Sequence, residues 1–271
     1  SYELDYFNVV QLLKAAAIPL RAEERDERHP ILIAGGPVIT ANPMPLSPFF
    51  DALAIGEGEV ILPPLVERLP QALKGTREET LAALAEVPGL YLPRGSHAQP
   101  VRRQWVRDLE SVATTSVVLT PDTELGDMYL IEIERGCAQG CRFCLAGHLF
   151  RPQRHRSLGA LLSQAKEGLR FRRRLGLVGA AVSDYPELEE LALALRREGA
   201  ELSFSSLRPP VPPYLLRVLE ESNTHTLTIA PEAGSERLRQ VINKGMAQDD
   251  ILKTVAEAAR QGLRQIKLYF M

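Results

Sequence analysis

Apolar residues recur along the chain in two spacings, and the alternation of these spacings predicts the fold. Short continuous apolar runs, which are typical of buried parallel strands, lie at 31–34, 52–55, 117–119, 129–133, 177–182, 202–204, 226–229 and 266–270. Apolar positions at helical intervals lie at 8–17, 65–69, 158–169, 188–197, 214–220 and 249–259. Alternating strands and helices favour an α/β fold with parallel strands and right-handed crossovers.

The first part of the chain is expected to form part of a doubly wound, Rossmann-like parallel sheet. The runs at 31–34 and 52–55 are each followed by glycines and then by a region of helical character. In such a sheet, ligands bind at the carboxyl ends of the strands, where these turns lie. A tight turn without a ligand explains Gly35 and Gly36 equally well. Residues 87–127 show no clear period and are expected to connect this part to the next.

The second part is expected to form a partial (β/α) barrel. From residue 128 onward, strand candidates alternate with helices in short units, which is the pattern of such barrels. The predicted domains are residues 1–115, a partial α/β domain with its connecting segment, and residues 116–271, the partial barrel. In a barrel, chemistry takes place on the loops that follow the strands.

Composition says more about the class and the cellular location of the protein than about any reaction that it catalyses. With 45% hydrophobic residues, 24% charged residues and a formal net charge of −2, the chain is an ordinary globular protein and needs no polyanionic partner. No run of about 18 apolar residues and no signal-like amino terminus is present, so neither a membrane partner nor export is expected. Clustered thiols without a disulfide framework favour the cytoplasm.

All three cysteines lie within eight positions, in the order Cys137, Cys141 and Cys144, with Phe143 directly before the last. Thiolates normally hold a four-iron cluster, and three of them would leave one iron open to a cofactor. Three cysteines in one glycine-rich turn do not alternate as core positions would. A zinc site is the main rival, because His148 follows Cys144 by four residues and Cys3His is an accepted zinc set. That alternative describes a zinc-stabilised nucleic-acid-binding module without catalysis.

This loop resembles the signature of the radical S-adenosylmethionine (SAM) enzymes. The resemblance implies that the cysteines hold a [4Fe-4S] cluster, that SAM chelates the fourth iron, and that the reduced cluster cleaves SAM to methionine and a 5′-deoxyadenosyl radical. It also implies an electron donor such as a flavodoxin or a ferredoxin. The barrel of this family usually has six strands, and five are countable here. The chain is therefore expected to be cut after the fifth strand, and also at its start, since it begins with Ser1.

The first part resembles the later half of the cobalamin-binding domain that precedes the barrel in one subgroup of this family. The residues that carry this resemblance are Ala34-Gly35-Gly36-Pro37, Asn42-Pro43, Asp51 and Gly56-Glu57-Gly58-Glu59. The chain lacks an Asp-x-His-x-x-Gly segment to supply a lower ligand to cobalt, and the front strands of such a domain would precede Ser1. The resemblance thus leaves cobalamin binding open for the full-length protein, and with it methyl transfer to an unreactive carbon.

The loops after the barrel strands are expected to bind SAM. Arg208 could pair bidentately with the methionine carboxylate, and Glu232 could accept hydrogen bonds from the ribose hydroxyls or the amino group. Ser183 and Ser206 could donate to either end. Phe143 is expected to pack beside the cluster and adenine. Helix capping or a mutual ion pair explains Arg208 and Glu232 equally well, and a core position explains Phe143. No residue is assigned a catalytic role.

Basic residues cluster after the cysteine loop, at Arg151, Arg154, His155 and Arg156, and again within 170–174. Such runs are usually solvated faces. A nucleic-acid partner is the less favoured interpretation, which rests on the related enzymes that methylthiolate tRNA. No aromatic residues are interleaved to form a stacking platform.

Overall fold

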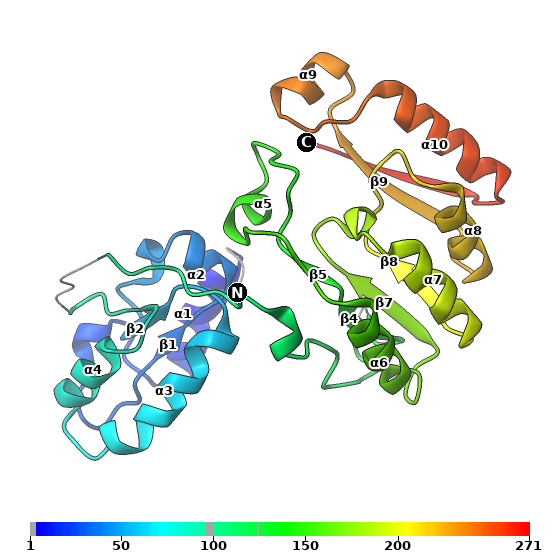
Figure 1. Cartoon of the computed structure of the whole chain (residues 1–271). Helices are drawn as coiled ribbons and strands as arrows, with labels where there is room; N and C mark the ends of the chain where they lie inside the picture. The colour runs from blue at the N-terminus through cyan, green and yellow to red at the C-terminus, as the bar shows by residue number, and fades with distance from the viewer. Residues whose placement is uncertain (1–3, 96–99, 124) are drawn as a thin grey trace. The chain divides into compact units, whose positions relative to one another are not determined.

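The computed structural model describes residues 4–95, 100–123 and 125–271 (Figure 1). The chain divides into two compact units, Ser1–Arg107 and Asp108–Met271. Both contain parallel strands flanked by helices, so the predicted α/β class is confirmed. The predicted boundary after residue 115 falls inside the second unit. No helix in the described parts of the chain is long and apolar enough to cross a membrane.

The first unit contains one sheet of three short strands in the order β1-β2-β3. Its strands are β1 (Ile33–Ala34), β2 (Ala52–Ala54) and β3 (Leu90–Tyr91), and its helices are α1 (Asp5–Ala15), α2 (Pro37–Ala41), α3 (Gly58–Ala72) and α4 (Arg77–Ala85), with 3-10 turns at Ala22–Glu24 and Met44–Leu46. Strands β1 and β2 are parallel, as predicted, whereas β3 runs antiparallel to β2. The segment predicted to connect the two parts therefore contains a strand, β3. A strand of two residues is too short to show a period in the sequence.

The glycine turns after β1 and β2 are required by the backbone. Gly36 has φ 107° and stands at the start of α2, and Gly56 has φ 135°. A Cβ atom on Gly56 would lie 2.1 Å from the carbonyl oxygen of Gln104. Gly36 thus needs glycine for its backbone conformation, and Gly56 needs it for both conformation and space. Their presence is explained without a ligand.

A buried charge network fixes the starts of β1 and β2. The Asp51 carboxylate accepts hydrogen bonds from Arg25 Nη1 at 3.0 Å and from the backbone N–H of Leu32 at 2.8 Å. Its other oxygen lies 2.8 Å from Arg77 Nη2. The remaining donors of Arg25 reach backbone carbonyls, including that of Phe49 at 2.6 Å. Asp51, one of the residues behind the cobalamin-domain resemblance, is therefore saturated by protein partners.

The second unit carries the five strands predicted for the barrel. They are β4 (Met128–Glu132), β7 (Arg174–Val178), β8 (Glu201–Phe204), β9 (Thr226–Glu232) and β10 (Gln265–Phe270), and a short antiparallel pair joins β5 (Glu134–Arg135) to β6 (Arg154–His155). The parallel order is β4-β7-β8 in one sheet and β9-β10 in another. A hydrogen bond of 3.1 Å from the Leu207 N–H to the Thr228 carbonyl links the segment after β8 to β9.

Helices cover one side of these strands (Figure 1). The helices of this unit are α5 (Leu145–Leu149), α6 (Leu158–Gly168), α7 (Leu188–Arg197), α8 (Pro213–Glu221), α9 (Glu236–Val241) and α10 (Gln248–Arg260), with 3-10 turns at Leu109–Ser111 and Val182–Asp184. One core forms between strands and helices and includes the buried side chains of Ile131, Leu177, Leu202 and Ile229. The loops that follow these strands carry the residues of the site.

Two strand predictions need correction. Residues 117–119 form no strand, and Val117 and Val118 are 94% and 80% exposed. The strand predicted at 177–182 is β7, which begins at Arg174 and ends at Val178. Beyond β7 the apolar run belongs to a loop that ends in a 3-10 turn, in which Ala180 is exposed and Val182 is buried. Apolar runs alone do not distinguish such a loop from a strand.

The boundary between the units is explained by Arg156, which is fully buried. Its guanidinium donates to the carbonyls of Leu109 and Val112 and to Thr114 Oγ1, and it forms an ion pair of 2.9 Å with Glu132. Residues 108–114 are therefore fastened to β4. This arginine belongs to the basic run after the cysteine loop, and it acts inside the fold and not on a solvated face.

Candidate functional site

The cysteine loop runs from the end of β5 to the start of α5 and depends on two left-handed glycines. Gly136 has φ 87° and Gly140 has φ 68°. A Cβ atom on Gly136 would lie 2.5 Å from the carbonyl oxygen of Phe150, so only glycine fits there. Cys137 and Cys141 are buried, whereas Cys144 is partly exposed and caps the amino end of α5.

Backbone N–H groups point at two of the three sulfur atoms. The N–H of Gln139 lies 3.4 Å from Cys137 Sγ, and that of Gly147 lies 3.3 Å from Cys144 Sγ. Hydrogen bonds to sulfur are among the ways in which proteins tune iron–sulfur clusters. Two of the three sulfur atoms therefore already accept a hydrogen bond from the backbone of the loop.

One cavity is lined by the three cysteines and by every other predicted binding residue, namely Phe143, Ser183, Ser206, Arg208 and Glu232. These five come from the cysteine loop and from the segments after β7 and β8 and the end of β9. The cavity holds about 140 Å³, below the roughly 300–1,000 Å³ of typical ligand sites, so a nucleoside-sized ligand would extend beyond it. The structure thus brings the predicted residues together, while their roles stay predictions.

The guanidinium of Arg208 is anchored at one nitrogen. Its Nη2 atom donates to the carbonyl oxygens of Lys244 and Gly245, the latter at 2.9 Å. The backbone N–H of Arg208 donates to Ser183 Oγ at 2.9 Å. Arg208 is therefore held by both its backbone and its side chain, with the guanidinium at the cavity wall.

Glu232 pairs with Lys244 and not with Arg208, which was the alternative drawn from the sequence. Lys244 Nζ lies 3.2 Å from Glu232 Oε1, and both side chains are mostly buried. Lys244 Nζ also lies 5.7 Å from the centroid of the Phe143 ring. Glu232 has φ 65°, a left-handed conformation that is uncommon for residues other than glycine. Such strain is concentrated at functional sites.

Three polar or flexible residues of the cavity, Gln139, Lys244 and Met246, were not predicted from the sequence. Lys244 and Met246 follow α9, and no strand directly precedes them, so the rule that barrel loops carry the chemistry did not point to them. A local signal exists, since Asn243 and Gly245 flank Lys244 and both have positive φ, which is typical of a tight turn.

Burial raises the pKa of the Cys137 thiol, and the carboxyl groups of Asp184 and Glu134 add to this effect, while the N–H of Gln139 opposes it. A bound metal would reverse the balance, since metal ligation requires the thiolate and releases the proton. Glu134 itself is buried and accepts a hydrogen bond from the N–H of Ala181 at 2.6 Å. It thereby fixes the loop after β7 beside the cysteines.

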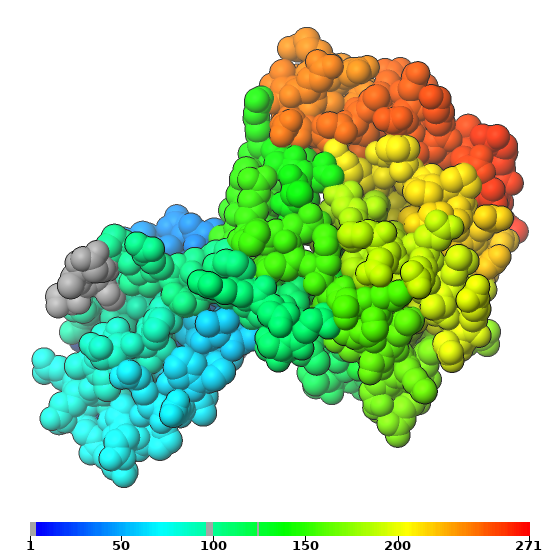
Figure 2. All heavy atoms as spheres, in the orientation of Figure 1, coloured from blue at the N-terminus to red at the C-terminus, as the bar shows by residue number. Residues whose placement is uncertain are grey.

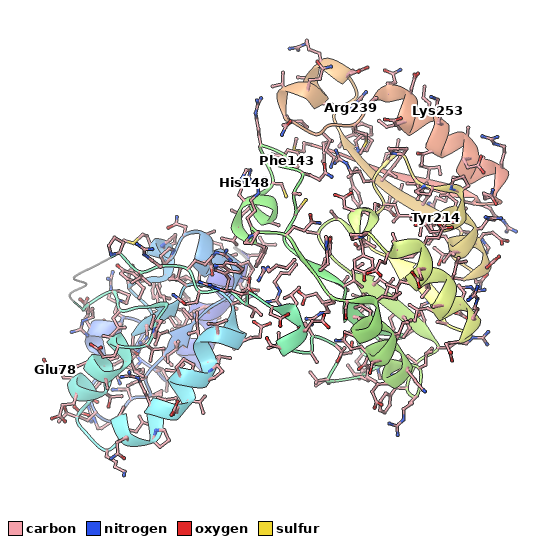
Figure 3. The ribbon with its side chains drawn as sticks, viewed as in Figure 1. Glu78, Phe143, His148, Tyr214, Arg239 and Lys253 are labelled. Atoms are coloured by element: carbon pink, nitrogen blue, oxygen red, sulfur yellow. The ribbon has the colours of Figure 1, made fainter. Side chains whose placement is uncertain are left out.

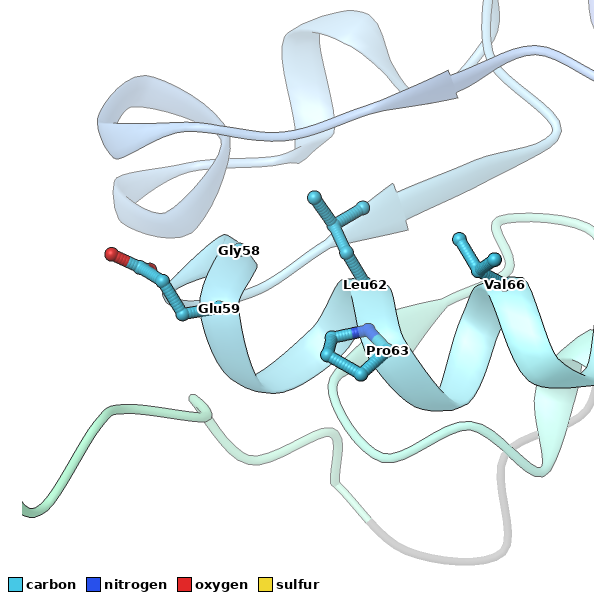
Figure 4. A pocket seen from close by; sticks show the side chains of 5 residues that line it. All are labelled: Gly58, Glu59, Leu62, Pro63 and Val66. Atoms are coloured by element: carbon cyan, nitrogen blue, oxygen red, sulfur yellow. The ribbon is translucent and has the colours of Figure 1, made fainter. Parts of the chain in front are cut away.

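The rival zinc interpretation requires His148 as a fourth ligand. The imidazole Nε2 of His148 faces the carbonyl oxygen of Cys141 at 3.1 Å. In the described residues, no group of three or more His, Cys, Asp or Glu side chains converges tightly enough to hold one metal ion. Zinc ligands must meet at a single point, about 2.0–2.3 Å from the metal, whereas the thiolates of a four-iron cluster bind separate irons. Figure 3 shows Phe143 and His148 on this part of the chain.

Comparison with protein families decides the class. Residues 131–271 match the family described as the radical SAM superfamily, and residues 1–93 match the family described as radical SAM proteins, N-terminal. The chain belongs to the radical SAM superfamily. Membership implies a [4Fe-4S] cluster and SAM, and it confirms at superfamily level the prediction of a radical SAM enzyme.

Two relatives match most of the chain. An uncharacterized protein, MJ0966, of Methanocaldococcus jannaschii is 34% identical over 276 residues, which cover 100% of this chain and 56% of that protein. An uncharacterized methyltransferase, PH0819, of Pyrococcus horikoshii is 23% identical over 253 residues, which cover 87% of this chain and 52% of that protein. The chain thus spans about half the length of these relatives.

A solved structure shares the fold. It is the radical SAM methyltransferase TsrM from Kitasatospora setae with cobalamin and a [4Fe-4S] cluster bound, which matches with a TM-score of 0.58 and 15% identity. The match covers 86% of this chain and 48% of TsrM. At this identity the likeness establishes the fold alone.

Proposed function

We propose that Cys137, Cys141 and Cys144 hold a [4Fe-4S] cluster and that SAM binds beside them. When bound, these two groups supply the reductive cleavage of SAM that starts radical chemistry. The observation that carries the proposal is the cavity in which the three thiols meet the binding residues predicted from separate loops. The family match supports the same cofactors.

The protein's own residues are proposed to orient SAM by its polar ends. Arginine has five N–H donors; because Nη2 of Arg208 is bound to backbone carbonyls, Nε and Nη1 are the atoms proposed to meet the methionine carboxylate. Glu232 is proposed to accept from the ribose hydroxyls or the amino group. Ser183 and Ser206 would donate to either end, and Phe143 would pack beside adenine.

We further propose that the full-length protein transfers a methyl group with the help of cobalamin. Support comes from the resemblance of residues 34–59 to part of a cobalamin-binding domain and from the names of TsrM and of the Pyrococcus relative. His29 is not placed as a ligand, because its Nδ1 lies 2.8 Å from Asp26. Titration of the full-length protein with hydroxocobalamin tests this, and absence of binding would contradict it.

The proposed partner is an electron donor, a flavodoxin or a ferredoxin, since the chemistry needs a reduced cluster. The cytoplasm is the proposed compartment, because clustered free thiols persist in reducing surroundings. Nucleic acid stays outside the proposal. The basic residues that suggested it include Arg154 and Arg156, which are buried, and Arg170, which lies 2.8 Å from Glu167.

Iron content and SAM cleavage test the proposal together. After anaerobic reconstitution, the full chain should hold about four irons and cleave SAM when a chemical reductant is added. Changing any one of Cys137, Cys141 or Cys144 to Ala should remove both properties. The matched control is His148→Ala, which should keep both, because His148 is not a proposed ligand. Zinc in place of iron, lost in the His148 variant, would establish the rival interpretation instead.

A further inference from the structure

The segment that follows α9, residues 242–246, lies directly against the cysteine loop. The N–H of Arg142 donates to the Ile242 carbonyl at 2.9 Å, and Asn243 Nδ2 donates to the Gly140 carbonyl at 2.8 Å. Figure 2 shows atoms of the two regions, green and orange, meeting on this face of the second unit. The cysteine loop and this segment therefore hold each other's backbone in place.

Together with Met246 of the same segment, Lys244 lines the cavity. Its ammonium group lies 3.2 Å from the Glu232 carboxylate and 5.7 Å from the centre of the Phe143 ring, within the range of a cation–π contact. Its backbone carbonyl accepts from Arg208. One residue thus contacts three of the five side chains proposed to bind SAM.

The environment gives the ion pair between Lys244 and Glu232 more weight than an exposed pair would have. The side chains are only 12% and 15% exposed, so water screens them little. Glu232 also holds a left-handed backbone conformation at the end of β9. The Glu232 side chain is mostly buried at the wall of the cavity, and the Lys244 ammonium is in direct contact with its carboxylate.

We propose that Lys244 is a positioning residue of the SAM pocket, which acts by holding the Glu232 carboxylate in the orientation that receives the polar groups of SAM. The inference rests on the proposed function. It differs from a direct role, in which the ammonium would bind SAM itself. It also differs from a purely structural role, in which Lys244 would only fasten residues 242–246. The three roles predict different couplings between Lys244 and Glu232.

A double-mutant cycle on SAM affinity separates these roles. The dissociation constant of SAM is measured by calorimetry on the reconstituted full chain carrying Lys244→Met, Glu232→Gln, both changes, or neither. Lys244→Met should weaken binding about tenfold, the low end for a charged hydrogen bond. In the Glu232→Gln background, the same change should weaken binding less than about twofold, because the carboxylate to be positioned is gone.

Further variants control for charge and folding. Lys244→Arg should restore most of the affinity, since the cation is kept. Lys253→Met, an exposed lysine on α10 (Figure 3), should leave affinity and iron content unchanged. If Lys244→Met fails to hold iron, Lys244→Gln provides the same cycle with a side chain that retains hydrogen bonding.

Three results would overturn the inference. Equal weakening by Lys244→Met in both backgrounds would show that Lys244 acts without Glu232. No weakening in the wild-type background would show that it does not act on binding at all. Unchanged SAM affinity in Glu232→Gln would show that Glu232 does not bind SAM, so Lys244 could not act through it. SAM cleavage by the same iron-loaded variant would leave the proposed function intact.

Discussion

The two units use their buried charges in opposite ways. In the first unit, the Asp51 carboxylate contacts Arg25, Arg77 and the N–H of Leu32. The other donors of Arg25 form hydrogen bonds with backbone carbonyls. In the second unit, Arg208, Glu232 and Lys244 line a cavity next to three thiols. Charged residues near strand ends thus serve architecture in one unit and are proposed to serve binding in the other.

The buried charges of the two units differ in whether protein atoms satisfy all of their hydrogen-bonding groups. A buried charge whose partners are all protein atoms is satisfied without a ligand, and removing one partner leaves the others unpaired. A charge at the wall of a cavity can exchange contacts with a ligand. Strain gives a second distinction, because Glu232 has φ 65°. Substitutions in the two units should therefore affect different measurements.

The largest expected effect is on the stability of the first unit. Asp51→Ala should lower the free energy of unfolding by about 3–5 kcal/mol, because it leaves Arg25 buried without its counter-charge. Chemical denaturation measures this loss. Glu78→Ala, an exposed residue of α4 (Figure 3), is the matched control and should cause a much smaller loss. Equal effects of the two changes would contradict the architectural role of Asp51.

The next effect concerns binding in the second unit. Arg208→Ala should weaken SAM binding by about 1.5–3 kcal/mol, the scale of a charged hydrogen bond, and leave the iron content unchanged. Glu232→Ala should act in the same direction. Calorimetry on reconstituted protein measures both, with Arg217→Ala on the exposed side of α8 as the control. Affinity that stays at the wild-type value in both variants would contradict the assigned pocket.

The smallest expected effect is a dependence of folding stability on pH. It concerns Glu132, a charged residue of the second unit that, like Asp51 in the first, has a structural role. Burial favours its neutral form, but Arg135 and Arg156 outweigh this and lower its pKa below the ordinary 4.5. A lowered carboxyl pKa contributes stability above pH 4.5, and this contribution is lost as the pH falls through the folded-state value. The stability difference between wild type and Glu132→Gln should therefore be greatest near pH 7 and shrink below pH 4.5.

The control for this measurement is Glu198→Gln, an exposed residue that directly follows α7. Its stability difference from wild type should be small and should vary less with pH. A Glu132→Gln difference that grew on acidification would show that the ion pairs with Arg135 and Arg156 do not stabilise the folded state.

Much of this architecture follows from local pattern. The apolar runs predicted β4, β8, β9 and β10 because buried parallel strands need continuous apolar side chains. The same reasoning failed at 117–119, where exposed valines mimic a strand, and at Leu90–Tyr91, where a strand is too short to show a period. In both cases, whether a segment forms a strand depends on a neighbouring strand to pair with, and a local pattern holds no information on that neighbour.

The site divides along the same line. The three cysteines and Phe143 were predicted from the spacing of the signature loop. Ser183, Ser206, Arg208 and Glu232 were predicted because barrel loops carry the chemistry. Lys244 was missed because it follows a helix and reaches the cavity through long-range contacts with Gly140, Arg142 and Arg208. Residues that position others leave little trace in a single sequence, since their function depends on tertiary contacts.

The central claim is that SAM binds beside a cluster held by Cys137, Cys141 and Cys144. Electron–nuclear double resonance on the reduced full chain tests it most directly, with SAM that carries nitrogen-15 in its amino group. The account predicts a cluster signal with hyperfine coupling to that nitrogen, lost together with the cluster in Cys141→Ala. A cluster signal without coupling to SAM, or a metal-loaded protein without a cluster signal, would contradict it.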